Sequence, residues 1–294
     1  MELTDEPSLA ELVDAVQAED RRVDLVGAVR RAGDQNFVLE TTEWIYRFPR
    51  SWIDLDREVA LLAALDGRLP VEIPRVEWVG QRSRFCAYRK IVGRSFDRDR
   101  YLSGTRGHQR ALAASMAEYV VAMHEALTET EIASIGIPDF FSLEARADLI
   151  DPNDVPASVR PDVESMLARA RDLSGRLVGR MLLDNDFTSD NIVLDPDSGL
   201  LSGVWDFSGV TMGPASFDFR ALLRDPDPLT EDVVREYERR TGREICREAY
   251  VIAFRITDLR RQMRKGPADA VRLVHSWRGP SRSVDSPGSR SCSG

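Results

Sequence analysis

The sequence has few cysteines and lacks a long apolar run, and both absences narrow the class of protein. Cysteine occurs at only three of the 294 positions, Cys86, Cys246 and Cys292. Their number is odd and their spacing fits neither a CxxC motif nor a zinc-ligand set, so we expect reduced thiols in a cytoplasmic protein. No stretch approaches about 20 uninterrupted apolar residues, so a membrane span is not expected. The first residues, MELTDEPSLAELVDAV, lack the basic and apolar regions of a secretory signal.

The sequence also lacks an excess of positive charge. Its 40 basic and 49 acidic residues give a formal net charge of −9, which opposes binding to nucleic acid or to anionic membranes. This charge favours a cationic partner, although solubility alone is the more ordinary reason for it. A hydrophobic content of 43% leaves enough material for one large domain or two modest ones.

The pattern of apolar residues changes along the chain. A short amphipathic helix over 8–18 is followed by strand and turn signals, including a hairpin in FVLETTEWIYRFPR, and by a helix in IDLDREVALLAAL. We therefore expect a small antiparallel-sheet lobe over residues 1–91. Helical spacing dominates a second lobe over residues 92–278, and the Ser-, Gly- and Arg-rich residues 279–294 are expected to be disordered.

The segment LLDNDFTSDNIVLD, followed by DPDSG, carries unusually many polar residues for a strand pair. A turn at DPDSG folds the chain so that Asn191 and Asp206 meet at the open end of a hairpin, with Asp186 in the loop that enters it. Two carboxylates and a carboxamide suit Mg²⁺, which takes its other ligands from water and phosphate. Asp184 and Asp195 are interpreted as ordinary turn residues.

A second pair points to nucleotide chemistry. Glu58 shares a helix face with Leu55, Leu62 and Leu65, so it faces the core and needs a cation. Arg47, in the preceding strand segment, is the natural partner. Such a pair can orient a basic group onto phosphates, and it is also compatible with a plain structural salt bridge.

Together these motifs resemble the aminoglycoside phosphotransferase family, whose fold is bilobal and protein-kinase-like. The Asn-Asp start of the catalytic loop is most similar to the 2″-phosphotransferase branch. The resemblance implies Asp186 as the catalytic carboxylate, Asn191 and Asp206 as Mg²⁺ ligands, and Arg47 as a phosphate contact positioned by Glu58. It implies that the backbone of Arg89 and Ile91 binds the purine of ATP or GTP beside Tyr88. It also implies that Asp218 buttresses the catalytic loop and that His124 packs.

The chain departs from the family pattern at three positions. Ser208 is the third residue of the DFG-like triplet, Gly33 stands alone in the nucleotide loop, and Arg47 replaces the usual lysine. The expected activity is phosphorylation of an aminoglycoside hydroxyl, an antibiotic-resistance function, with Glu236 and Glu238 as candidate acceptor contacts. Alternatives are a kinase for another antibiotic or metabolite, and a nucleotide-binding pseudokinase.

Overall fold

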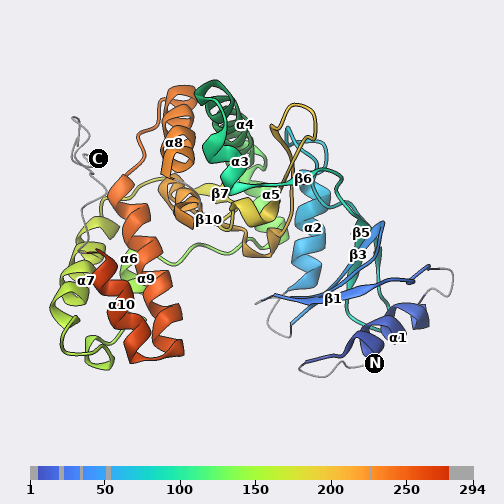
Figure 1. Cartoon of the computed structure of the whole chain (residues 1–294), viewed down its shortest axis with the longest axis horizontal. Coiled ribbons are helices and arrows are strands. Elements are labelled where there is room, and N and C mark those ends of the chain that lie inside the picture. The colour runs from blue at the N-terminus through green and yellow to red at the C-terminus, as the bar shows by residue number, and fades with distance from the viewer. Residues whose placement is uncertain (1–5, 20–22, 34–35, 51–53, 225–226, 278–294) are drawn as a thin grey trace.

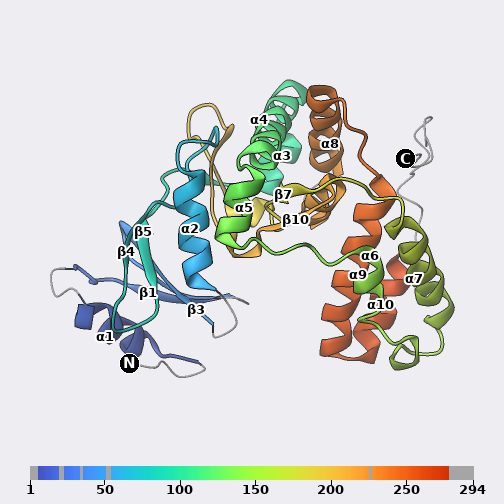
Figure 2. The same ribbon diagram turned by 180° about the vertical axis from the view of Figure 1, so that it is seen from behind.

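The structure, a computed structural model, consists of two lobes joined through the segment between β5 and β6 (Figures 1 and 2). An antiparallel sheet with helices α1 and α2 forms the smaller lobe, and helices dominate the larger one. This arrangement confirms the predicted α+β class and the bilobal fold. The tail that we expected to be disordered, 279–294, lies outside the described part of the chain. The structure describes residues 6–19, 23–33, 36–50, 54–224 and 227–277.

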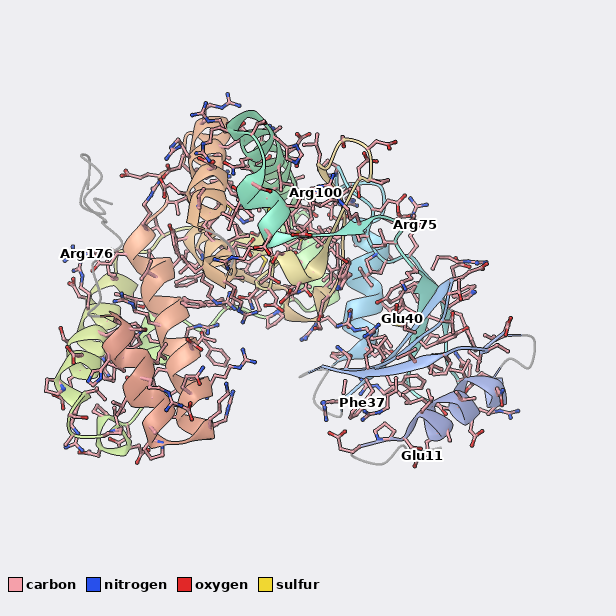
Figure 3. All side chains as sticks on the ribbon, viewed as in Figure 1. Glu11, Phe37, Glu40, Arg75, Arg100 and Arg176 are labelled. Atoms are coloured by element: carbon pink, nitrogen blue, oxygen red, sulfur yellow. The ribbon has the colours of Figure 1, made fainter. Side chains whose placement is uncertain are left out.

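The sheet of the smaller lobe has an α1 face and an α2 face. Its strands pair antiparallel in the order β1-β2-β3-β5-β4. Side chains alternate along β3, so Tyr46 and Phe48 pack on the α1 side while Ile45 and Arg47 lie on the α2 side. Phe37, labelled in Figure 3, extends the α1 side. The elements are α1 (Leu9–Glu19), β1 (Val29–Ala32), β2 (Asn36–Glu40), β3 (Trp44–Pro49), α2 (Leu55–Leu65), β4 (Val76–Val79) and β5 (Cys86–Arg89).

Helix α2 is held in place by its N-cap and its apolar face. The carboxylate of Asp54 accepts a hydrogen bond from the Arg57 N–H at 3.1 Å. Leu55 and Leu62 are buried, as their helical spacing predicts. Glu58 lies on the same face and its side chain is only 3% exposed. The predicted orientation of Glu58 toward the interior is therefore confirmed.

The first strand begins later than the sequence pattern predicts. The segment VDLVGAVRR predicts a strand over 23–31, but β1 starts only at Val29. The Asp24 carboxylate accepts from the Val26 N–H at 2.9 Å, and Gly27 adopts a φ of +72°. The chain therefore turns before it extends. The hairpin predicted in FVLETTEWIYRFPR is confirmed, because β2 and β3 pair antiparallel.

Two apolar cores organise the larger lobe. One core joins α4 and α8 with strands β8 and β9, and the other joins α6, α7, α9 and α10 (Figure 2). Strand β7 supplies Leu182 to the first core and Leu183 to the second, so the loop that follows β7 starts at their boundary. Strand β7 pairs with β10, and β6, β8 and β9 form a small sheet.

The elements of the larger lobe follow in chain order. They are β6 (Arg94–Ser95), α3 (Arg98–Ser103), α4 (Arg106–Glu125), α5 (Glu129–Ile135), α6 (Leu143–Ala147), the 3-10 helix η1 (Pro152–Asp154), α7 (Arg160–Ser174), β7 (Met181–Leu183), η2 (Ser189–Asn191), β8 (Ile192–Leu194), β9 (Leu201–Val204), η3 (Phe207–Gly209), β10 (Thr211–Gly213), η4 (Ala215–Arg224), α8 (Asp227–Thr241), α9 (Arg247–Lys265) and α10 (Pro267–Trp277).

Most predicted helices are present with shifted ends. Apolar spacing in HQRALAASMAEYVVAMHEAL predicts a helix over 108–127, and this helix is α4. The region 140–177, for which the sequence predicts helix or loop, contains α6, η1 and α7. Helix α10, which begins at Pro267, is not predicted by the sequence pattern. Only Ala270 and Val274 of this helix are fully buried, and two positions are too few to establish a helical period.

The cysteines differ from one another in state. Cys86 is a free thiol buried in the smaller lobe, as expected. Cys246 is disulfide-bonded, so the expectation of a reduced thiol is wrong for it. Cys292 lies outside the described residues. Among the helices that the structure describes, none is long and apolar enough to cross a membrane.

Candidate active site

The hairpin of β8 and β9 brings Asn191 and Asp206 to the same end, as its turn predicts. The carboxylate of Asp195 accepts from the backbone amides of the turn, and Gly199 adopts a φ of +69°. Ile192 at the start of β8 lies opposite Val204 at the end of β9. Just beyond this pair, the Trp205 N–H donates to the Asn191 carbonyl at 3.0 Å. Asn191 and Asp206 therefore flank the open end of the hairpin.

Asp186 lies against this end of the hairpin, in the loop after β7. The Asn191 side-chain amide donates to the Asp186 carbonyl at 2.9 Å and to Oδ2 at 3.2 Å. Arg224 from η4 approaches Asp186 Oδ1 at 3.7 Å. Burial raises the pKa of Asp186 above its ordinary value; Arg224 opposes this rise, and Asp206 adds to it. A partly exposed carboxylate with a raised pKa is suited to accept a proton.

The backbone around the site is held in an uncommon conformation. Among the described residues, Asn185 and Asp206 are the non-glycine residues with positive φ, at 68° and 69°. Asn and Asp tolerate this region better than most side chains. The Asn185 amide donates to the Gly209 carbonyl at 2.8 Å, and the Ser208 hydroxyl donates to Asp206 Oδ1 at 2.6 Å. Side-chain hydrogen bonds thus hold both turns, as is typical of functional sites.

A buried polar group, Asp218, holds the backbone of the loop that follows β7. Asp218 accepts the backbone N–H groups of Asp184 at 3.2 Å and Asn185 at 2.6 Å. His124 lies between Asp218 Oδ2, at 3.1 Å, and the Tyr237 hydroxyl, at 2.9 Å. The expectation that Asp218 buttresses the loop is confirmed by these contacts, and His124 is buried and hydrogen-bonded, in keeping with a packing role.

The interpretation of Asp184 as an ordinary turn residue is wrong. It directly follows β7, which runs into the interior, and it is only 1% exposed. Its carboxylate accepts from the Tyr119 hydroxyl and, at 3.2 Å, from the Asp186 N–H. Burial and the neighbouring charge of Asp218 raise the pKa of Asp184 well above its ordinary value. Asp184 is therefore part of the support beneath Asp186.

Arg47 links the two lobes. Its guanidinium forms ion pairs with Glu58 of α2 and with Asp206. When the Asn36 carboxamide is oriented with its oxygen toward Arg47, Oδ1 of Asn36 accepts from Nε at 3.0 Å and from Nη2 at 2.7 Å. Burial raises the pKa of Glu58, and Arg47 opposes this rise. Burial would also raise the pKa of Asp206, but Arg47 and Ser208 outweigh it, so the net shift is downward. The predicted Arg47–Glu58 pair is present, and Asn36 is a contact that the sequence did not reveal.

The segment between the lobes carries the predicted purine contacts. Arg89 and Ile91 line a cavity of about 500 Å³ together with Glu43 and Lys90. Tyr88 precedes them at the end of β5 and is buried on the α2 side of the sheet. Burial raises its pKa, although Arg47 opposes the rise. The structure therefore places Arg89 and Ile91 beside an open volume on the segment that joins the lobes, whereas Tyr88 is not among the residues that line it.

The two candidate acceptor residues lie on α8 and already have partners. Glu236 accepts hydrogen bonds from Arg239 at 2.7 Å and Arg240 at 2.8 Å. Glu238 accepts from Arg247 at 2.8 Å. Among the described residues, no hydrogen bond or ion pair joins either carboxylate to the catalytic loop. The structure thus does not bring them into the cluster around Asp186.

Two arginines of η4 belong to the site and were missed from the sequence. Arg224 approaches Asp186, and Arg220 donates to the Asn185 carbonyl at 2.8 Å. The segment RALLR, which follows Asp218 closely, carries them four residues apart. That spacing indicates a shared helical face and was the available signal.

The side-chain oxygens of Asn191 and Asp206 suit a metal ion that takes its remaining ligands from phosphate. Within the described residues, no cluster of three His, Cys, Asp or Glu side chains is arranged to hold a metal ion. Asn191 and Asp206 supply two oxygen donors, and Oδ1 of Asp206 also accepts hydrogen bonds from Arg47 and from the Ser208 hydroxyl. Mg²⁺ commonly takes one or two protein oxygens and completes its shell with phosphate and water. The residues therefore fit Mg²⁺ in that manner.

Comparisons with known proteins agree with this geometry. The model of the phosphotransferase enzyme family (APH) matches residues 27–251. The GDP and kanamycin complex of APH(2″)-IIIa is 18% identical and superposes with a TM-score of 0.76, covering 90% of this chain and 97% of that one. The gentamicin complex of APH(2″)-IIa is 18% identical, with a TM-score of 0.62 and coverage of 92% and 96%.

Macrolide kinases share the same fold. The macrolide 2′-phosphotransferase MphH from Brachybacterium faecium is 18% identical, with a TM-score of 0.62 and coverage of 96% and 99%. A comparison with curated proteins found no match. At these identities the likeness to solved structures establishes the fold alone. The similar structures include phosphotransferases for aminoglycosides and for macrolides, which are chemically different acceptors.

Proposed function

The chain belongs to the phosphotransferase enzyme family, and on this premise we propose that it transfers the γ-phosphoryl group of ATP or GTP to a hydroxyl of an aminoglycoside. The observation that carries the proposal is the convergence of Asp186, Asn191 and Asp206, with Arg47 bridging Asp206 to Glu58. This arrangement combines a proton acceptor, two oxygen donors and a fixed cation at one place. These are the parts that phosphoryl transfer requires.

Asp186 has the position of the group that orients the acceptor hydroxyl. As the hydroxyl oxygen forms its bond to the γ-phosphorus, the bond from that phosphorus to the β-phosphate oxygen breaks, and the nucleoside diphosphate leaves. The hydroxyl proton passes to a carboxylate oxygen of Asp186, whose raised pKa favours the transfer. Mg²⁺ bound through Asn191 and Asp206 would neutralise charge on the phosphates.

The nucleotide would lie between the lobes. Arg47 is held by Glu58 and Asn36, so its charge is fixed in position for phosphate oxygens. The backbone of Arg89 and Ile91 would hydrogen-bond the purine in the cavity that they line. Several of the similar structures are described as GDP, ADP or ATP complexes, which supports a nucleotide co-substrate.

The aminoglycoside acceptor is supported by two observations. Similar structures are described as complexes with kanamycin, gentamicin and streptomycin. The net charge of −9 attracts a polycation over distance. If Glu236 and Glu238 contact this acceptor, its ammonium groups must displace their present arginine partners.

A second acceptor class is favoured by arginines near Asp186. Arg220 and Arg224 flank the catalytic loop, and a cationic surround attracts an anionic acceptor more readily than a cationic one. A kinase for another antibiotic or metabolite hydroxyl is therefore the alternative.

The test is a turnover assay. Purified protein is given Mg²⁺ with ATP or GTP and a panel of aminoglycosides, a macrolide and hydroxylated metabolites with and without an anionic group. Release of nucleoside diphosphate is measured, with Asp186→Ala as control. We expect acceptor-dependent release that the variant loses. Nucleotide binding without turnover on any acceptor would contradict an enzyme and favour a pseudokinase, whereas turnover only on acceptors without amino groups would contradict the aminoglycoside.

A further inference from the structure

Three arginines of the larger lobe lie close together and form no ion pair among the described residues, although the charges of Asp186 and Asp218 act on one of them, Arg220. Arg146 on α6 has a buried Nε that lacks a hydrogen-bond partner, and its Nη1 reaches only the Thr257 hydroxyl at 3.5 Å. Arg220 on η4 donates only to the carbonyls of Asn185 and Phe217. Arg260 on α9 forms no ion pair within the described part of the chain.

These guanidinium groups share one neighbourhood. The Arg146 Cζ lies 3.9 Å from the centroid of the Phe140 ring, and the Arg220 Cζ lies 5.6 Å from the same centroid. Burial first, and then the charges of Arg220 and Arg260, lower the pKa of Arg146 to about 9. Burial likewise lowers the pKa of Arg220, and the charges of Asp186 and Asp218 oppose this change. We call Arg146, Arg220 and Arg260 the arginine cluster.

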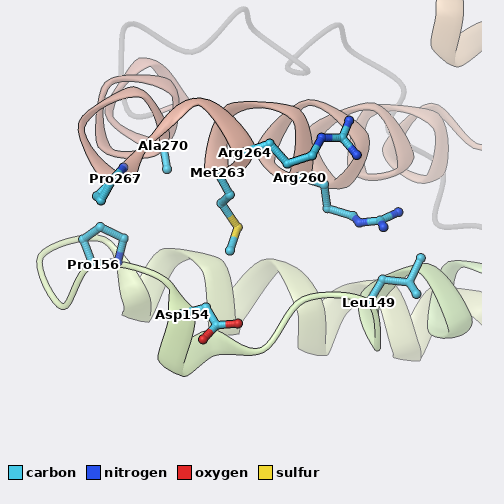
Figure 4. Close-up of a pocket in the computed structure, with 8 residues that line it drawn as sticks. All are labelled: Leu149, Asp154, Pro156, Arg260, Met263, Arg264, Pro267 and Ala270. Atoms are coloured by element: carbon cyan, nitrogen blue, oxygen red, sulfur yellow. The ribbon is translucent and has the colours of Figure 1, made fainter. Parts of the chain in front are cut away.

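An open volume adjoins the cluster. Arg260 lines a cavity of about 380 Å³ with Arg264 and Met263, and Asp154 and Leu149 lie on the opposite wall (Figure 4). Like charges gathered in a partly buried place destabilise the fold unless an anion compensates them. Arg47, another buried arginine of the chain, avoids this cost because it forms ion pairs with two carboxylates.

We propose that the arginine cluster binds an anionic group, a carboxylate or a phosphate, carried by the molecule that accepts the phosphoryl group. The planar forks of guanidinium groups match both anions through paired hydrogen bonds. The orphaned Nε of Arg146 supplies an unused donor. The face of Phe140 keeps the Arg146 guanidinium in place.

The position of the cluster assigns the anion to the acceptor. Arg220 contacts the carbonyl of Asn185, the residue before Asp186, so one member of the cluster adjoins the catalytic loop itself. The nucleotide phosphates are expected at Arg47, which lies in the other lobe. An acceptor whose hydroxyl is at Asp186 could therefore reach the cluster with a second group. This inference rests on the proposed kinase activity and favours its second acceptor class.

The first experiment measures anion binding without turnover. Inorganic phosphate and acetate are titrated into the full chain by calorimetry and followed by thermal denaturation, with ATP and Mg²⁺ absent. We expect Arg146→Gln to weaken binding by about tenfold or more, since each hydrogen bond to a charged group contributes that much. Arg255→Gln is the matched control, because burial alone lowers the pKa of Arg255 and its guanidinium lies over Trp277.

The outcomes separate this proposal from the kinase proposal. No binding, or equal binding by wild type and Arg146→Gln, would mean an adventitious ion only and would overturn the cluster as a site. Binding that needs Arg146 supports the site even if no acceptor is ever phosphorylated. In turnover assays, phosphate should compete with the acceptor and Arg146→Gln should raise KM more than it lowers kcat. Phosphate that binds the cluster without competing would overturn its assignment to the acceptor.

Discussion

Replacing Arg47 with methionine tests the link between the lobes. Methionine keeps much of the length of the side chain but removes the charge. The side chains of Arg47 and Glu58 are 5% and 3% exposed, so water cannot take the place of the lost partner. Removing one member of a buried ion pair costs about 3–5 kcal/mol. Asp206 is 32% exposed and can turn to water, so we expect its share of the loss to be about 1 kcal/mol or less.

The loss should depend on pH. Burial raises the pKa of Glu58 and Arg47 opposes this rise, so the Arg47→Met change raises it further. An acid whose folded pKa exceeds its unfolded value binds more protons in the folded state. Stability then falls as pH rises from the unfolded pKa to the folded one. The variant should therefore lose more stability at pH 8 than at pH 5, where Glu58 can protonate.

The assay is urea denaturation of four proteins at both values of pH. They are wild type, Arg47→Met, Glu58→Gln and the double variant. Because Glu58→Gln removes the stranded charge, the double variant should recover most of the stability that Arg47→Met loses at pH 8. It should not recover the proposed phosphoryl transfer, since Arg47, the cation that we propose for the nucleotide phosphates, is still missing. A loss below about 1 kcal/mol at pH 8, or a double variant no more stable than Arg47→Met, would refute the reasoning.

Three further predictions concern other parts of the site. Asp186→Asn should lower kcat by about 10²- to 10⁴-fold, and the wild-type kcat/KM should fall as pH drops through a value above the ordinary aspartate pKa; a flat pH profile down to pH 4 would contradict this. Tyr119→Phe removes a hydrogen bond to buried Asp184 and should cost about 1–3 kcal/mol in thermal denaturation, with a larger effect on kcat than on KM; unchanged stability would count against the support role. Gly203→Ala places a Cβ within 2.5 Å of a neighbouring side chain and should cost about 1–3 kcal/mol, whereas Gly175→Ala, which meets no atom within 4 Å, should be close to neutral; equal stability of the two variants would contradict the packing argument.

The features that the sequence predicted correctly are mostly local. The orientation of Glu58 follows from the helical period of its neighbours, and the meeting of Asn191 with Asp206 follows from the turn after Asp195. Each depends on residues within about fifteen positions of one another, where dihedral preferences and side-chain periodicity act. The Arg47–Glu58 pair could be predicted for the same reason, because a strand and the helix that follows it pack together.

Contacts between distant segments could not be predicted in this way. Nothing beside Asp184 in the sequence shows that Tyr119 will bury it, and the turn signal of its neighbours pointed to solvent. The pairing of Arg47 with Asp206 spans the two lobes and needs both to be folded.

The sequence by itself determined the two-lobed order of elements, the polar hairpin and the residues available for chemistry, because these depend on periodicity and turn preference. The tertiary structure alone decided the charge balance around them. It buried Asp184, paired Glu236 and Glu238 with arginines, and gathered Arg146, Arg220 and Arg260 without an ion pair among the described residues. The physical reason is that burial and distance set the energy of a charge, and both arise only when remote segments pack together.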